Sequence, residues 1–135
     1  MNIKPIDDRL SVSPQILPAD MQELARQGFK SVICNRPDGE AESQPSFAAI
    51  RQAAKAAGLE CRYLPVTPGK VGDSDVSAFV AAMQSLPRPV LAYCRTGTRS
   101  ALLWSLDQRA QGADLSELLR KTASAGYDLS GALQK

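Results

Sequence analysis

The sequence predicts a single α/β domain, residues 1–135, in which helices cover both faces of a four-stranded, mainly parallel sheet. Short apolar runs typical of strands alternate along the chain with longer segments whose apolar residues recur at helical spacing. A chain of 135 residues with 44% hydrophobic residues also has the right size for one domain with its own core. Because a helix between two strands usually makes a right-handed crossover, the strands are expected to run parallel.

Each expected element is bounded by turn residues. The strands are short apolar runs that end in polar turns, at residues 9–13, 29–35, 59–66 and 88–94. The helices occupy residues 17–28, 46–58, 73–86, 100–112 and 114–126. Pro18 suits the first turn of the first helix, Gly28 and Gly58 suit C-terminal caps, and Asp73 or Ser74 suits an N-terminal cap. Residues 112–135 are expected to form a helical annex.

Charge and cysteine content exclude several classes of protein. Sixteen basic and fourteen acidic residues are dispersed and leave a formal charge of +2, so neither nucleic acid nor a membrane is an expected partner. The three cysteines, Cys34, Cys61 and Cys94, are far apart and odd in number. They indicate free thiols in a reducing cytoplasm rather than a disulfide framework or a zinc site. No secretory leader or membrane span is expected.

The chain contains no histidine. Its absence removes Ser–His and Cys–His triads and imidazole metal ligands from consideration. We therefore expect no metal and no cofactor. A nucleophile in this protein has to be activated in another way.

The stretch CRTGTRS, residues 94–100, is the strongest candidate site. Ligands of parallel sheets bind beyond the carboxyl ends of the strands, and Cys94 ends a strand directly before a helix. The inward N–H groups of such a turn and the helix dipole form an anion nest that also favours a thiolate. Gly97 lets the backbone turn, Arg99 can fold over an oxyanion, and Ser100 can donate a hydrogen bond to the sulfur. The predicted catalytic residues are Cys94, Arg99 and Ser100, and the predicted anion-binding residues are Arg95, Thr96, Gly97 and Thr98.

Neighbouring residues are weaker candidates. In the turn NRPDGE, Arg36 either contacts the anion or is solvated, and Asp38 either orients an arginine or belongs to a Pro-Asp-Gly turn. Tyr93 either places its hydroxyl near the loop or lies in the core. Cys34 and Cys61 are expected to be small buried apolar residues.

Three segments of the chain resemble a known family, the phosphatase-like domain of beta-lactamase hydrolase-like proteins. In family order they are LSVSPQILPADMQELARQGFKSVICNRPDGE, YLPVTPGKVGDSDVSAFVAAM and PVLAYCRTGTRS. The resemblance extends to about Gln111 and implies the cysteine-phosphatase fold of dual-specificity phosphatases. Related domains occur fused to a metallo-β-lactamase-like domain, so the resemblance also implies a persulfide-oxidising metalloenzyme as a partner in trans.

The loop departs from the phosphatase pattern. Phosphatases of this fold carry His-Cys, five residues and then Arg; here Tyr93 replaces the His, and only four residues separate Cys94 from Arg99. The shorter loop is similar to the active-site loop of rhodaneses, sulfurtransferases that hold a persulfide on the cysteine.

The general acid of the phosphatases is also missing from its usual place. Its position falls in the turn TPGKVG, which holds no carboxylic acid. Asp73 or Asp75 can reach back from the helix start, but each is more simply an N-terminal cap. Transfer of sulfur from thiosulfate needs no acid, because sulfite leaves without a proton.

Three functions follow from the sequence. The favoured one is transfer of sulfane sulfur from a small anionic substrate, thiosulfate or a persulfide, through a Cys94 persulfide to a thiol such as glutathione. The alternatives are a phosphate monoester hydrolase with a phospho-cysteine intermediate, and a non-catalytic anion-binding module.

Overall fold

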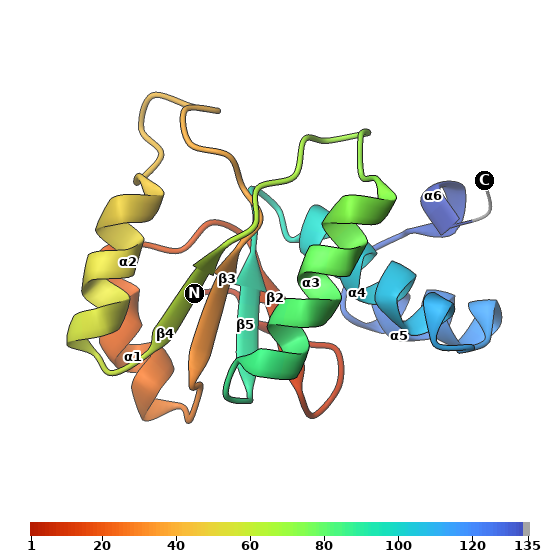
Figure 1. The fold of residues 1–135 in the computed structure, drawn as a ribbon, viewed down its shortest axis with the longest axis horizontal. Helices are drawn as coiled ribbons and strands as arrows, with labels where there is room; N and C mark the ends of the chain where they lie inside the picture. Colours follow the sequence, from red (N-terminus) through yellow and green to blue (C-terminus); the bar gives the residue numbers. More distant parts are fainter. Residues whose placement is uncertain (134–135) are drawn as a thin grey trace.

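Five strands form one mixed sheet in the computed structural model, which describes residues 1–133 (Figure 1). Four of them are parallel and lie in the order β2 (Leu10–Ser13), β5 (Val90–Tyr93), β3 (Ser31–Cys34) and β4 (Glu60–Tyr63). A short edge strand, β1 (Lys4–Pro5), pairs antiparallel with β2. Since β5 is the central strand, the residue that follows it lies in the middle of the sheet's carboxyl edge.

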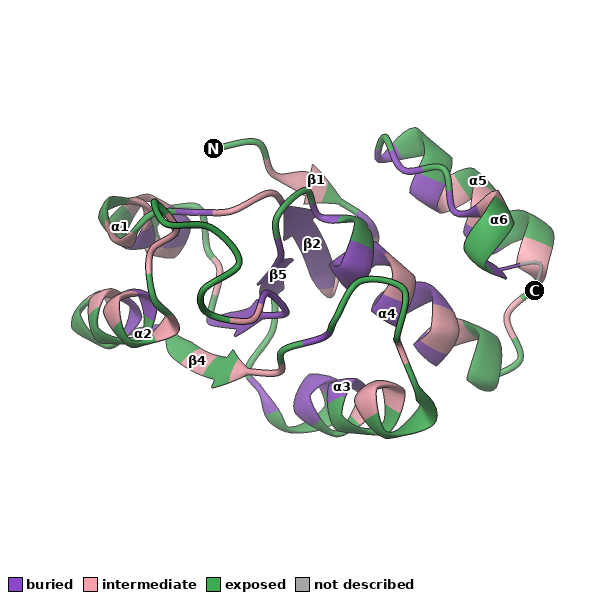
Figure 2. Cartoon of the chain, turned by 90° about the horizontal axis from the view of Figure 1, so that it is seen from above, coloured by how far each residue is buried: buried purple, intermediate pink, exposed green. Residues whose placement is uncertain are grey.

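Two helices cover each face of the sheet (Figure 2). One face packs against α1 (Met21–Arg26), which follows the 3-10 turn η1 (Pro18–Asp20), and against α2 (Phe47–Ala56). The other face packs against α3 (Asp73–Ser85) and α4 (Thr98–Ala110). Alternate residues of β5 enter the two cores, Leu91 with the first pair of helices and Ala92 with the second, as the period of a strand requires.

The C-terminal annex packs on the outer side of α4 (Figure 2). It consists of α5 (Leu115–Ser124) and α6 (Ser130–Leu133), joined by a turn. Leu118 and Leu133 are buried in the same core as α4, and the Arg109 guanidinium donates to the carbonyl of Leu133. The annex is therefore an integral layer of the domain rather than a loose tail.

The predicted fold class is confirmed, including four parallel strands and helices on both faces. The structure corrects it by one strand, because β1 has only two residues and carries no periodic signal. It also starts α4 at Thr98, inside the candidate loop, where the prediction began at residue 100. Within residues 1–133 no helix combines the length and apolar character needed to cross a bilayer.

Candidate functional site

The candidate site lies where the turns after β2, β3 and β5 meet. The backbone N–H of Asn35, after β3, donates to the carbonyl of Tyr93 at 2.8 Å, and that of Gln15, after β2, donates to the carbonyl of Arg95 at 3.3 Å. These bonds extend the sheet pairing past the strand ends. They hold the turn that begins at Cys94 between its two neighbours.

The Cys94 sulfur is fully buried and faces the N-terminus of α4. The backbone N–H of Gly97 donates to Cys94 Sγ at 3.1 Å. Gly97 is the N-cap of α4 and adopts a left-handed backbone with φ of 98°, which a glycine tolerates without strain. The sulfur is therefore a hydrogen-bond acceptor at a helix N-terminus, an arrangement that suits a thiolate.

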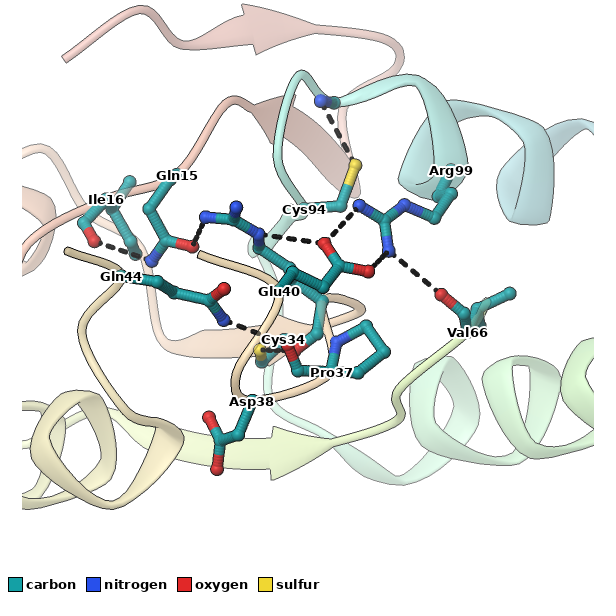
Figure 3. Close-up of polar contacts among 12 residues, drawn as sticks. Gln15, Ile16, Cys34, Pro37, Asp38, Glu40, Gln44, Val66, Cys94 and Arg99 are labelled. Atoms are coloured by element: carbon teal, nitrogen blue, oxygen red, sulfur yellow. Dashed lines mark hydrogen bonds and ion pairs between the residues drawn. The ribbon is translucent and has the colours of Figure 1, made fainter. Parts of the chain in front are cut away.

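Arg99 points from the first turn of α4 across the site to Glu40 (Figure 3). Its two terminal nitrogens donate to the two oxygens of the Glu40 carboxylate at 2.8 and 2.9 Å, and Nη1 also donates to the carbonyl of Val66 at 3.0 Å. Hydrogen bonds from Arg99 hold the pKa of Glu40 below its usual value, although partial burial opposes them. The same pairing raises the pKa of Arg99.

A second arginine binds the same carboxylate. Arg36 Nε donates to Glu40 at 3.0 Å, and Arg36 Nη1 donates to the side-chain oxygen of Gln15 at 3.0 Å. Both arginines are buried, at 5% and 8% exposure. A chain of polar contacts thus runs from Gln15 through Arg36 and Glu40 to Arg99, beside Cys94 (Figure 3).

The pairing with Glu40 and Val66 leaves one edge of the Arg99 guanidinium free. A guanidinium has five N–H donors, of which Nη1 uses two and Nη2 uses one in these bonds. The remaining Nη2–H and the Nε–H point the same way and form a two-donor fork. Such a fork matches two oxygens of a phosphate-like or sulfonate-like anion. Figure 3 shows the Cys94 sulfur on the side of Arg99 away from Val66, and the proximity of Cys94 contributes to the raised pKa of Arg99.

A cavity of about 280 Å³ opens next to the loop. Its polar wall comes from the loop itself, and its apolar wall comes from the turn after β4 and from α4. The lining residues are Pro68, Gly69, Val71, Arg95, Thr96, Thr98, Arg99 and Leu102. The predicted anion-binding residues Arg95, Thr96 and Thr98 therefore border one cavity together with Arg99, and Gly97 contributes its N–H to the sulfur.

Ser100 does not play the part expected from the sequence. Its hydroxyl donates to the side-chain oxygen of Asn35 at 2.8 Å, and the Asn35 amide donates to the carbonyl of Leu64 at 2.9 Å. A hydroxyl has one proton to donate, so it is not available to the Cys94 sulfur. Ser100 instead ties α4 to the turns after β3 and β4.

Asp38 and Tyr93 also lie away from the expected contacts. The Asp38 carboxylate accepts from the backbone N–H of Phe47 at 2.8 Å, at the start of α2, and contacts neither Arg36 nor Arg99. Tyr93 is buried in the core beneath α1 and α2, and burial raises the pKa of its hydroxyl. The reason is the strand period, which turns Tyr93 to the face opposite Ala92.

Of the two aspartates at the start of α3, only Asp75 makes a capping contact, and the N-cap residue is Gly72 instead of the expected Asp73 or Ser74. Asp75 accepts from the backbone N–H of Gly72 at 2.9 Å, which is the capping arrangement expected as the simpler alternative. Asp73 is exposed in the first turn of α3. Neither residue borders the cavity beside the loop.

Sequence reasoning missed Glu40, Gln15, Asn35 and Tyr127. Asn35 and Glu40 are the first and last residues of the turn NRPDGE, which also contains the predicted Arg36 and Asp38. A carboxylate two residues beyond Asp38 was a usable signal for Glu40. The Tyr127 hydroxyl donates to the carbonyl of Thr96 at 3.1 Å. No local pattern announces that contact, because it depends on how the annex packs against α4.

Comparisons with known proteins identify relatives with similar sequence and fold. A relative from Agrobacterium fabrum, named beta-lactamase hydrolase-like protein, is 37% identical over 131 residues, which is 94% of this chain and 30% of that protein. This chain thus spans about a third of its relative's length. A crystal structure of a candidate phosphatase from Neisseria meningitidis is 41% identical, with a TM-score of 0.91 over 99% of this chain and 95% of that one.

A more distant structure has the same fold. P. aeruginosa TpbA in complex with pTyr is 21% identical, with a TM-score of 0.70 over 93% of this chain and 75% of that one. The family described as "Beta-lactamase hydrolase-like protein, phosphatase-like domain" matches residues 2–111. The match contains every strand of the sheet and the whole of the Cys94 loop, and the chain belongs to this family.

Proposed function

We propose that this phosphatase-like domain transfers sulfane sulfur through a persulfide on Cys94. The observation that carries the proposal is the pairing of an acceptor sulfur with an arginine fork, at a site where residues 1–133 place no protonated carboxyl group in contact with the arginine. Among residues 1–133, Glu40 is the carboxylate that contacts Arg99, and two arginines keep it ionised. A reaction whose leaving group needs no proton suits this site best.

The first step is attack of the Cys94 thiolate on the outer sulfur of thiosulfate. A new S–S bond forms, the S–S bond of thiosulfate breaks, and sulfite leaves with the bonding electron pair. In the second step an acceptor thiolate such as that of glutathione attacks the outer sulfur of the Cys94 persulfide. Cys94 then leaves as a thiolate, so no external oxidant, reductant or acid is consumed.

The residues around Cys94 have separate roles in these steps. The Gly97 N–H stabilises negative charge on the Cys94 sulfur. The free fork of Arg99 binds the oxygens of the sulfonate end of the donor, while Glu40 fixes the guanidinium plane. The apolar side of the cavity, with Val71 and Leu102, has room for an uncharged part of a donor or acceptor.

Phosphate ester hydrolysis is the second candidate, favoured by the fold and by the names of its neighbours. The Neisseria protein is described as a candidate phosphatase, and TpbA is seen with pTyr. The Arg99 fork suits phosphate as well as sulfonate. This candidate requires an acid for the leaving alkoxide, which Asp73 or Asp75 would supply only after movement of the start of α3. A non-catalytic anion-binding module is the third candidate and predicts binding without turnover.

Cellular partners are part of the same proposal. The three free cysteines are compatible with a reducing cytoplasm. Because the Agrobacterium relative is about three times as long, its remaining sequence is the natural source of a coupled activity. We propose that a persulfide-oxidising metalloenzyme in trans takes the glutathione persulfide that this domain produces.

Two assays with the same preparations test the proposal. Intact-protein mass is measured after brief incubation with thiosulfate, and p-nitrophenyl phosphate turnover is measured in parallel, for wild type and Cys94→Ser. We expect wild type alone to gain the mass of one sulfur atom, to lose it to glutathione, and to show negligible phosphatase activity. Phosphate release that depends on Cys94 without sulfur loading would replace the proposal with the phosphatase. Absence of both sulfur loading and phosphate release would favour the binding module.

A further inference from the structure

A single peptide unit of the Cys94 loop is held at both of its ends. The carbonyl of Thr96 accepts from the Tyr127 hydroxyl at 3.1 Å, and the N–H of Gly97, in the same peptide unit, donates to Cys94 Sγ at 3.1 Å. This peptide bond is trans. In a trans peptide the C=O and N–H point in opposite directions, so the direction of one fixes the direction of the other.

From this geometry we infer that Tyr127 is a positioning residue for Cys94. By binding the Thr96 carbonyl on the outer side of the loop, the Tyr127 hydroxyl keeps the Gly97 N–H turned toward the sulfur. Tyr127 acts through the loop backbone and not on the substrate. The C-terminal annex, whose purpose the sequence did not disclose, thereby completes the site.

The Thr96–Gly97 peptide needs such a restraint because glycine permits it to rotate. Gly97 has a φ of 98°, and a residue without a Cβ accepts positive and negative φ almost equally. A rotated peptide would place a carbonyl, rather than an N–H, against the sulfur and would oppose a thiolate. The hydroxyl of Tyr127 is the side-chain donor that meets the Thr96 carbonyl and stabilises the productive orientation.

Packing supports the same role. A Cβ built on Gly97 would collide with the Tyr127 hydroxyl and ring, so the tyrosine lies directly against the turn. Tyr127 itself is 8% exposed, and its backbone N–H donates to the carbonyl of Thr122 at 2.9 Å. Burial and then the charge of Cys94 raise the pKa of Tyr127 above its usual value, so the hydroxyl keeps its proton in the neutral range.

The inference rests on Cys94 as the nucleophile of the proposed function but not on the identity of the substrate. Tyr127→Phe keeps the ring and removes the hydroxyl. Thr122→Val is the matched control, because it removes a buried hydroxyl of the same annex that donates to the carbonyl of Leu118 and does not contact the loop. Both variants are first compared with wild type in thermal unfolding followed by circular dichroism.

Two measurements on the full chain report on the loop. The Gly97 amide signal is followed by ¹H–¹⁵N NMR as pH rises, since an N–H that donates to sulfur responds when the thiol ionises. Alkylation of Cys94 by iodoacetamide is followed across pH by peptide mass. Neither needs a sulfur donor or a phosphate ester, so failure of the proposed function leaves this test intact.

We expect Tyr127→Phe to lose the pH response of the Gly97 amide and to shift the alkylation profile to higher pH. At neutral pH the alkylation rate should fall roughly fivefold, as for loss of one ordinary hydrogen bond to a neutral carbonyl. Thr122→Val should match wild type in both readouts, even if it unfolds at a lower temperature. An unchanged Gly97 response and profile in Tyr127→Phe, or equal changes in both variants, would overturn the inference.

Discussion

Cys94 and Cys34 end neighbouring strands of one sheet, and both are buried, at 0% and 2% exposure. The two sulfurs differ in whether they donate or accept a hydrogen bond. The Cys34 sulfur donates to the carbonyl of Arg36 at 3.2 Å, which requires a protonated thiol, and burial raises its pKa. The Cys94 sulfur accepts from the Gly97 N–H at 3.1 Å and lies beside Arg99. Burial and strand position therefore do not distinguish a reactive cysteine in this fold; the groups that face the sulfur do.

Cys61 extends the comparison to β4. It is half-buried against the first core, and the charge of Arg51 opposes the effect of burial on its thiol. Burial raises its pKa to about 12. Burial is thus the dominant influence on the Cys61 thiol, and the sequence expectation of apolar roles for Cys34 and Cys61 agrees with their surroundings.

Cys94→Ser should give the largest effect of the variants, and Cys34→Ser is the matched comparison. Cys94→Ser removes the nucleophile and should abolish sulfur loading from thiosulfate. Cys34→Ser should retain most of it, because its sulfur faces a carbonyl of the backbone. Intact mass after a timed incubation measures both. Equal losses in the two variants would remove the distinction drawn between the cysteines.

Replacing Arg99, the arginine beside Cys94, should give the second-largest effect. Arg99→Lys keeps the charge but loses the two-donor fork, so kcat/KM for thiosulfate should fall roughly 100-fold. Arg9→Lys is the matched control. Arg9 forms an ion pair with Asp7 at 2.8 Å, and this pair lies away from the site. Sulfite release, followed colorimetrically, gives the rates. A fall of less than threefold in Arg99→Lys would show that charge alone suffices.

A smaller effect is expected from Glu40, which touches the arginine and not the substrate. Glu40→Gln should lower kcat/KM by about five- to tenfold, because the guanidinium plane loses its charged partner. Glu117→Gln, which removes an exposed carboxylate near Lys121 on the annex, should leave the rate unchanged. A rate increase in Glu40→Gln would instead mean that the carboxylate competes with the substrate for Arg99.

The smallest effect concerns stability in acid. The pKa of Glu40 is lowered from 4.5 in the folded protein, so its contribution is complete above about pH 4.5 and is lost as the pH falls through the lower folded value. Because the carboxylate is partly exposed, the contribution should be about 1 kcal/mol or less. Thermal unfolding of wild type and Glu40→Gln from pH 3 to 7 should show a difference that vanishes in acid. A difference that persists at pH 3 would point to packing instead of charge.

The sequence was sufficient for the fold and for the position of the candidate loop. Alternating periodicity located the four parallel strands, and the order of Cys, Gly and Arg singled out the turn in which the Gly97 N–H donates to Cys94 Sγ. Contacts between residues far apart in the sequence could not be predicted. Glu40 meets Arg99 across 59 residues, and Tyr127 meets Thr96 across 31, through packing that no local pattern encodes.

Errors of assignment had the same physical origin. Asp38 and Ser100 carry the right functional groups near the site, yet each is committed to a structural hydrogen bond, with Phe47 and Asn35 respectively. Residue type alone does not reveal which partner a short polar side chain will choose. Only the register of neighbouring turns decides it.

The most direct test is to locate the transferred sulfur among the three cysteines. Wild-type protein is treated with thiosulfate, the persulfide is capped with an alkylating agent, and the digested peptides are analysed by mass spectrometry. We expect the extra sulfur on the peptide that contains Cys94 and on neither of the others. Sulfur on Cys34 or Cys61, or none on Cys94 while turnover proceeds, would contradict the assignment of Cys94 as the nucleophile.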